Sequence, residues 1–220
     1  MIIGLHGRKK SGKDSVARML TSRHYVRGLQ PHIVDIRHVV PTSVPNELWA
    51  TDGVLPSVQL SFADPIKVIA HQLYDWDIQT LWGPSELREI PDERYPRGDG
   101  SYLTPRLFLQ IEGTEVARAC YPGTWTDKTF NLADELVRDG FARHITIADL
   151  RFDNEAVIVR NRGGHVLEIV NSRLPPSSDL HESEAGINPS HVSVRIINDD
   201  TFEVLRARVF AALEGFGVKL

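Results

Sequence analysis

Residues 1–20, MIIGLHGRKKSGKDSVARML, decide the fold. A short apolar run at residues 1–6 leads into Gly-Arg-Lys-Lys-Ser-Gly-Lys at residues 7–13. Val16, Met19 and Leu20 then recur at helical spacing, which predicts a helix from about residue 12 to residue 23. A G-x-x-x-x-G-K sequence between a strand and a helix is typical of a loop that wraps the phosphates of a nucleotide. The residues expected to bind those phosphates are Gly7, Lys10, Ser11, Gly12, Lys13, Asp14 and Ser15.

The residue types of this loop suit phosphate chemistry. Glycines let the backbone approach phosphate oxygens, and the N–H groups at a helix N-terminus supply positive potential. Lys13 is long enough to reach the β and γ phosphates, so we expect it to act in catalysis. Asp14 stands where most such loops carry a Ser or Thr that binds Mg²⁺, and Ser15 follows it. The Mg²⁺ ligands therefore stay open among Asp14, Ser15 and a later carboxylate, Asp149.

Strands and helices alternate along the rest of the chain. Apolar runs predict strands at residues 31–36, 57–62, 144–149, 165–170 and 192–197, and helical patterns begin near Asp64, Thr104, Thr126 and Asp200. Asp200 is expected to cap the last of these helices, in a capping box with Glu203. This order predicts an α/β fold: a three-layer αβα sandwich with a mostly parallel sheet, in a single domain over residues 1–220. In such sheets ligands bind beyond the carboxyl ends of the strands. Residues 78–103, rich in Pro, Gly and charge, are expected to form a functional flap.

The composition narrows the range of partners. The net charge of −4 arises from 25 basic and 29 acidic residues spread along the chain, so we expect no face built for nucleic acid. No run approaches the roughly 18 apolar residues of a membrane span, and no signal peptide is expected because Met1 leads directly into a strand. The single cysteine, Cys120, fits a reducing cytoplasm. Small charged molecules remain the expected partners.

The order of several further motifs resembles the phage-type deoxynucleoside monophosphate kinases, a branch of the P-loop nucleotide kinases. The motifs are Phe-Ala-Asp-Pro-Ile-Lys at 62–67, Thr-Pro-Arg at 104–106 with Gly-Thr-Glu at 113–115, Asp-Leu-Arg-Phe at 149–152 with Asn-Glu-Ala at 154–156, His-Glu-Ser-Glu at 181–184, and Asn-Asp at 198–199. With residues 7–15 they extend over most of the chain. The resemblance implies a P-loop NTPase fold and transfer of the ATP γ-phosphoryl group, with Mg²⁺ as cofactor, to a deoxynucleoside monophosphate (dNMP). It also implies a cytoplasmic protein, in the cytoplasm of a host cell if a phage encodes it.

One predicted helix carries a row of acceptor-site candidates. Arg106, Gln110 and Gly113 are four and three positions apart, so they share a helix face. The resemblance implies that Arg106 binds the acceptor phosphate and that Gln110 orients the nucleoside. Further residues that it implies for the acceptor site are Asp64, Lys67, Arg118 and Glu155, with residues 78–103 as the acceptor-binding flap. A solvated helix face, a helix N-cap at Asp64 and a surface ion pair at Arg118 are the alternatives.

Two residues at the end of a predicted strand suit phosphoryl transfer. Asp149 lies at the carboxyl end of the strand at 144–149, and Arg151 lies in the following turn. Asp149 would hold Mg²⁺ or polarise the acceptor, and Arg151 would neutralise charge on the transferring group. The alternative is an ion pair that caps the next helix.

The last third of the chain carries residues whose roles come from the resemblance. Residues 171–190 lie where nucleotide kinases have a mobile lid; Arg173 is implied as a catalytic phosphate contact, and His181 and Glu184 as lid residues. Asn198 and Asp199 resemble the loop that contacts the adenine of ATP, although a plain turn needs no ligand.

Other functions stay open. The Ser-Gly-Lys-Asp segment at 11–14 also resembles phosphomevalonate kinase, and the general layout resembles dephospho-coenzyme A kinase. In a different class, the chain would be a nucleotide-dependent switch or binding module, although it has no Asn-Lys-x-Asp guanine-recognition motif. The preferred base and sugar, and whether the protein is a homodimer, also stay open.

Overall fold

A single large sheet organises the computed structural model, which describes residues 1–21, 23–28, 33–34, 57–175 and 185–218. In these residues seven strands pair in the order β3-β2-β4-β7-β1-β8-β9. They are β1 (Ile2–His6), β2 (Arg23–Tyr25), β3 (Ile33–Val34), β4 (Ser57–Leu60), β7 (His144–Leu150), β8 (His165–Val170) and β9 (Val194–Ile197). Neighbours are parallel except β2 and β3, which are antiparallel. The predicted α/β fold with a mostly parallel sheet is confirmed.

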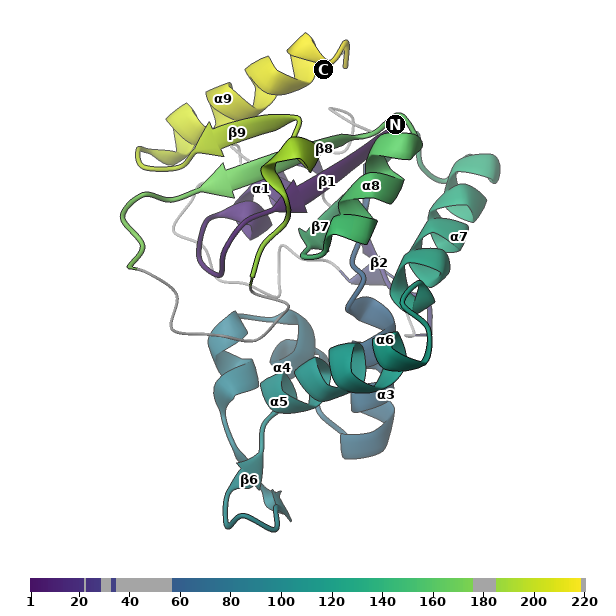
Figure 1. Ribbon diagram of the computed structural model, residues 1–220, viewed down its shortest axis with the longest axis vertical. Helices are drawn as coiled ribbons and strands as arrows, with labels where there is room; N and C mark the ends of the chain where they lie inside the picture. The colour runs from purple at the N-terminus through teal and green to yellow at the C-terminus, as the bar shows by residue number, and fades with distance from the viewer. Residues whose placement is uncertain (22, 29–32, 35–56, 176–184, 219–220) are drawn as a thin grey trace.

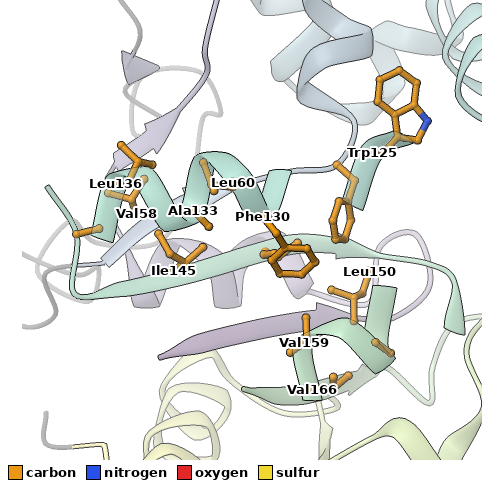
Figure 2. Close-up of a cluster of buried hydrophobic side chains, with 14 of the residues drawn as sticks. Val58, Leu60, Trp125, Phe130, Ala133, Leu136, Ile145, Leu150, Val159 and Val166 are labelled. Carbon is orange, nitrogen blue, oxygen red and sulfur yellow. The ribbon is translucent and has the colours of Figure 1, made fainter. Parts of the chain in front are cut away.

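Helices cover both faces of the sheet (Figure 1). One apolar cluster joins α1 (Lys13–Leu20) and α9 (Phe202–Gly215) to Ile3, Leu5, Leu167 and Ile169 of the sheet. A second cluster joins α7 (Thr124–Arg138) and α8 (Asp153–Asn161) to the other face, where Phe130, Ala133 and Val159 pack around Ile145 and Leu150 (Figure 2). Successive strand residues point to opposite faces, which explains why buried strands with few polar residues serve both clusters. The three-layer αβα sandwich is confirmed.

Residues 78–103 are built from short regular elements. They form α4 (Ile78–Trp82), the 3₁₀ helix η2 (Ser85–Glu89) and a hairpin of β5 (Asp92–Pro96) and β6 (Tyr102–Leu103), which projects from one end of the molecule (Figure 1). Aromatic rings hold the hairpin against α3 (Asp64–Tyr74). The ring centroid of Tyr74 lies 4.6 Å from that of Trp76 and 4.9 Å from that of Tyr95. This segment is therefore attached to the body of the protein by packing.

The helix predicted from Thr104 changes its winding part of the way along. The hydroxyl of Thr104 accepts a hydrogen bond from the Leu107 N–H, and α5 (Pro105–Gln110) begins directly after it, as predicted. A π-helical turn, η3 (Ile111–Val116), then separates α5 from α6 (Ala117–Cys120). The carbonyl of Gly113 within that turn accepts from Trp125 Nε1 at 2.8 Å. Such turns are rare and occur often at functional sites.

Several local predictions were wrong. Helix α3 has Ala63 as its N-cap, because the Asp64 side chain turns into the core, and α9 begins after Thr201, whose hydroxyl accepts from the Val204 N–H, so Asp200 is not its cap. The helix predicted to extend to residue 23 ends at Leu20, and β2 follows it. Of the strand predicted at 31–36, only residues 33–34 are described.

Candidate functional site

The loop between β1 and α1 has a shape that only glycine permits at two positions. Gly7 has φ +150° and Gly12 has φ +102°. A Cβ atom on Gly7 would lie 2.5 Å from the carbonyl oxygen of Ile169, and one on Gly12 would lie 2.3 Å from Nδ2 of Asn198. Both distances are shorter than any normal contact, so the loop is pressed against β8 and against the loop that follows β9.

Two polar groups of the loop are buried. The Ser11 hydroxyl has no hydrogen-bond partner among the described residues, and the side chain is 1% exposed. Lys13 is buried as the first residue of α1, with Nζ 3.4 Å from the carbonyl oxygen of Arg8. The side chain of Asn198 holds the loop from the other side by donating to the carbonyl of Ser11 at 2.8 Å. A buried hydroxyl without a partner raises the free energy of the folded state unless a ligand or water binds it.

A cavity of about 460 Å³ opens beside the loop. This volume lies within the roughly 300–1,000 Å³ of small-molecule sites. Among the side chains that line it, eight are cationic: Lys9, Lys10, Lys13, Arg18, Lys67, Arg88, Arg106 and Arg151. Four are acidic: Asp14, Glu86, Asp149 and Glu155. The whole chain carries a net charge of −4, so this local excess of positive charge indicates a site for an anionic ligand.

Three guanidinium groups meet at the cavity. Arg88 is fixed by donating to the carbonyl oxygens of Leu81, at 2.9 Å, and Gly83, at 3.1 Å. Burial, together with repulsion from Arg106 and Arg151, lowers the pKa of Arg88 to about 10. An anion bound among these groups would reduce the repulsion, so the cluster favours a phosphate-bearing ligand.

Acidic residues of η2 connect the phosphate loop to α5. Glu89 Oε1 lies 2.6 Å from Lys9 Nζ and 3.2 Å from Arg106 Nε, and Glu86 lies 3.3 Å from Lys10 Nζ. These ion pairs are largely exposed, and pairs of that kind contribute roughly 0–1 kcal/mol. They lie where η2 approaches both the phosphate loop and α5.

Lys67 and Asp149 lie in the same cavity. Burial and the nearby Arg88 lower the pKa of Lys67 to about 8. The two carboxylate oxygens of Asp149 accept from the backbone N–H groups of Phe62, at 2.9 Å, and Ala63, at 3.0 Å. Burial and the neighbouring Asp64 raise the pKa of Asp149 above its ordinary value. Asp149 therefore also ties β7 to the turn before α3.

Glu155 orients the turn that carries Arg151. Its Oε2 accepts from the N–H groups of Arg151, at 2.8 Å, and Phe152, at 3.1 Å, and burial raises the pKa of Glu155 to about 7. Arg118 donates to Glu155 Oε1 at 3.4 Å and to Asn154 at 3.0 Å, with its guanidinium 3.7 Å from the centroid of the Phe152 ring. Glu155 thus caps α8, the role that sequence reasoning left open for Asp149 and Arg151.

The cavity brings together eleven of the residues predicted from the sequence: Lys10, Lys13, Asp14, Ser15, Lys67, Arg106, Gln110, Gly113, Asp149, Arg151 and Glu155. Gly7, Ser11 and Gly12 shape the loop next to it. Within the described part of the chain, the lining does not include Asp64, Arg118, Arg173, Asn198 or Asp199. His181 and Glu184 lie outside the described residues, as does much of the predicted lid.

The predicted adenine loop lies on the other side of the phosphate loop. Arg173 donates to the carbonyl oxygen of Asp199, and the Asp199 carboxylate lies 3.2 Å from Arg208. These contacts satisfy the groups involved without a ligand, so an adenine contact stays a prediction.

Among the residues that line the cavity and that sequence reasoning missed are Arg18, His24, Gln59 and Arg88. Arg18 follows Asp14 by four residues and so shares its helix face, and Arg88 lies in the charged segment at 78–103. Both residues could therefore have been predicted from the sequence. Polar residues within the short strands β2 and β4 carry no such signal.

No protein-family model matches the sequence. Among curated proteins, the chain is 24% identical over 231 residues to a "putative deoxynucleotide monophosphate kinase" of Acanthamoeba polyphaga mimivirus, and the match covers 97% of this chain and 96% of the relative. The similarity supports a nucleotide kinase. Among the described helices, none is both long and apolar enough to cross a membrane.

Proposed function

We propose that this protein is a deoxynucleoside monophosphate kinase, which transfers the γ-phosphoryl group of ATP to a dNMP and releases ADP and a deoxynucleoside diphosphate. One observation carries the proposal: Lys13 of the phosphate loop lines the same 460 Å³ cavity as Arg88 and Arg106. Donor and acceptor are both polyanions, so their reaction needs cations on both sides of a shared site. The full-length similarity to the mimivirus protein favours a nucleotide as acceptor.

The proposed mechanism is direct in-line transfer without a covalent intermediate. Lys13 binds the β and γ phosphates of ATP, and Arg151 neutralises charge on the group in transfer. Arg88 and Arg106 bind the acceptor phosphate, with Lys67 as a third cation. The phosphate oxygen of a dNMP is already an anionic nucleophile, so catalysis rests on positioning and electrostatics.

We propose that Mg²⁺ enters with ATP. Asp14 and Ser15 line the cavity directly after Lys13, and carboxylate and hydroxyl oxygens are ligands that Mg²⁺ prefers. These two side chains fit the ion better than Asp149, whose two oxygens already accept backbone N–H groups. When bound, Mg²⁺ would neutralise charge on the β and γ phosphates.

The experiment is an acceptor screen. Purified protein with ATP and Mg²⁺ is incubated separately with each dNMP, each ribonucleoside monophosphate, mevalonate phosphate and dephospho-coenzyme A, and both ADP and the phosphorylated product are measured. We expect stoichiometric ADP and deoxynucleoside diphosphate with a dNMP. Transfer only to another acceptor would replace the proposed substrate, and ADP formation that no acceptor stimulates would favour a switch or binding module.

A substitution tests the phosphate loop. Lys13→Ala should remain folded and lose roughly 100-fold to 1000-fold in turnover, by analogy with other electrostatic stabilisers. Lys128→Ala, an exposed lysine on α7, is the matched control and should keep wild-type activity. Wild-type turnover in a folded Lys13→Ala variant would remove the loop from the mechanism.

A further inference from the structure

We propose that Gln59, oriented by His24 and Asp64, binds the base of the acceptor and thereby selects an acceptor that carries a nucleobase. The inference rests on the proposed function, because it assigns one part of the same cavity to the uncharged end of the dNMP. It gives a role to three buried polar residues that the phosphoryl-transfer mechanism does not use.

A carboxylate anchors this group of residues. Asp64 Oδ2 accepts from His24 Nε2 at 2.7 Å and from the Ser61 N–H at 2.9 Å, and Oδ1 accepts from Trp82 Nε1 at 2.9 Å. Burial alone would raise the pKa of Asp64, but His24, Lys67 and Trp82 outweigh that effect and hold the pKa below its ordinary value. Asp64 is therefore an ionised acceptor with three donors, although it is only 6% exposed.

The hydrogen bonds determine how the Gln59 amide faces its neighbour. An ionised carboxylate only accepts, so the proton on His24 that faces Asp64 is on Nε2. The amide nitrogen of Gln59 lies 3.4 Å from Nδ1, the His24 ring nitrogen that does not face Asp64. The Asp64–His24 pair thus directs the nitrogen of Gln59 toward His24.

The rest of the Gln59 amide is available to a ligand. Gln59 lies on β4, is 8% exposed, and lines the cavity together with His24. The amide nitrogen is the atom that faces His24, so the carbonyl oxygen and the second N–H of the amide remain for a ligand. An amide that offers an acceptor beside a donor matches the edge of a nucleobase, which offers a donor beside an acceptor.

The surroundings of Gln59 suit a planar, uncharged ring. Apolar side chains of Phe62, Ile66 and Leu109 line the same cavity; Phe62 lies in the turn after β4, Ile66 on α3 and Leu109 on α5. Phosphates would bind to the lysine and arginine groups, whereas a base needs neutral donors, neutral acceptors and apolar walls. The sugar phosphate of another acceptor class would leave the carbonyl oxygen of Gln59 without a hydrogen bond, which disfavours its binding.

The test compares acceptors with and without a base. For Gln59→Leu, we expect kcat/KM for the preferred dNMP to fall about 5-fold to 150-fold, which corresponds to the roughly 1–3 kcal/mol of a bidentate amide–base contact. We expect the KM for ATP to stay within about twofold, and turnover of 2-deoxyribose 5-phosphate, which has no base, to be the same in both proteins. Ser57→Ala is the matched control, since Ser57 lies on the same face of β4, is buried, and is not in the cavity lining.

A second variant separates orientation from contact. His24→Phe removes the group that orients Gln59, so we expect it to change the ratios of kcat/KM among the four dNMPs in the same sense as Gln59→Leu, while a merely structural role would leave those ratios unchanged. Gln59→Glu keeps the carbonyl oxygen and replaces the NH₂ donor with a second oxygen, and it provides the measurement if Gln59→Leu does not fold.

The outcomes distinguish this inference from the proposed function. If the wild-type protein phosphorylates dNMPs but folded Gln59 variants keep the wild-type kcat/KM and base ratios, Gln59 does not bind the base. An equal loss with dNMP and with 2-deoxyribose 5-phosphate would also overturn the inference. If the wild-type protein phosphorylates no dNMP, the proposed function fails and this inference with it.

Discussion

Replacing Glu155 with Gln tests the energetic consequence of burying a carboxylate at the N-terminus of α8. Burial raises the pKa of Glu155 from an ordinary 4.5 to about 7. Between these two values the folded protein binds the Glu155 proton more strongly than the unfolded chain does, so the free energy of unfolding decreases as pH rises through this window. A difference of about 2.5 pH units, at about 1.4 kcal/mol for each, gives a loss of about 3 kcal/mol between pH 4 and pH 8.

The assay is urea unfolding of the wild-type and Glu155→Gln proteins at intervals from pH 5 to pH 8. Gln does not titrate, so the free energy of unfolding of the wild type minus that of the variant should fall by about 2–3 kcal/mol across the series. Asp149, whose pKa is also raised, is present in both proteins, and its contribution largely cancels in the difference. The amide introduced by Glu155→Gln would pair less well with Arg118 than a carboxylate does, and the resulting loss of unfolding free energy is the same at every pH. It therefore shifts the difference between the two proteins without changing how that difference varies with pH. A difference that does not vary with pH would refute the reasoning.

Two further substitutions test close contacts. Gly12→Ala would place a Cβ atom 2.3 Å from Asn198 Nδ2 at φ +102°, so we expect ATP affinity to be lost in calorimetry and the unfolding free energy to fall by roughly 1–3 kcal/mol. Gly140→Ala, at φ +72° in open space, should lose only about 1 kcal/mol and keep ATP binding, and equal behaviour of the two variants would contradict the role of the contact. Trp82→Phe removes a donor to the buried carboxylate of Asp64 and should lower the unfolding free energy by roughly 1–3 kcal/mol in urea, whereas a loss near zero would show that this donor is dispensable.

The sequence predicted the parts of the fold whose signals are local. The strand at 165–170 was found with those bounds, and the strand at 144–149 was found one residue longer, because each is a short apolar run bounded by polar or glycine residues. The phosphate loop was found between a strand and a helix as predicted, since its glycine and lysine spacing already implies both neighbours.

The parts that could not be predicted depend on distant contacts. Strand β2 has three residues and exists through its parallel pairing with β4, which begins at Ser57. Asp64 looks like a helix cap in sequence, yet three donors, including the ring nitrogens of His24 and Trp82, draw its side chain into the core. The residues next to Gln59 in the sequence give no indication of a functional role. That role depends on the side chains that the fold places beside it.

The position of β1 in the sheet has a consequence for protein synthesis. This strand pairs with β7 on one edge and with β8 on the other, and Ile3 and Leu5 are at most 1% exposed. At roughly 5–20 residues per second, about 8 to 30 seconds of translation separate the emergence of β1 from that of β8. During most of that interval, until β7 is made, the first strand has neither of its two neighbours and its apolar side chains are accessible to chaperones. The phosphate loop, which follows β1 directly, therefore acquires its final shape only after most of the chain has left the ribosome.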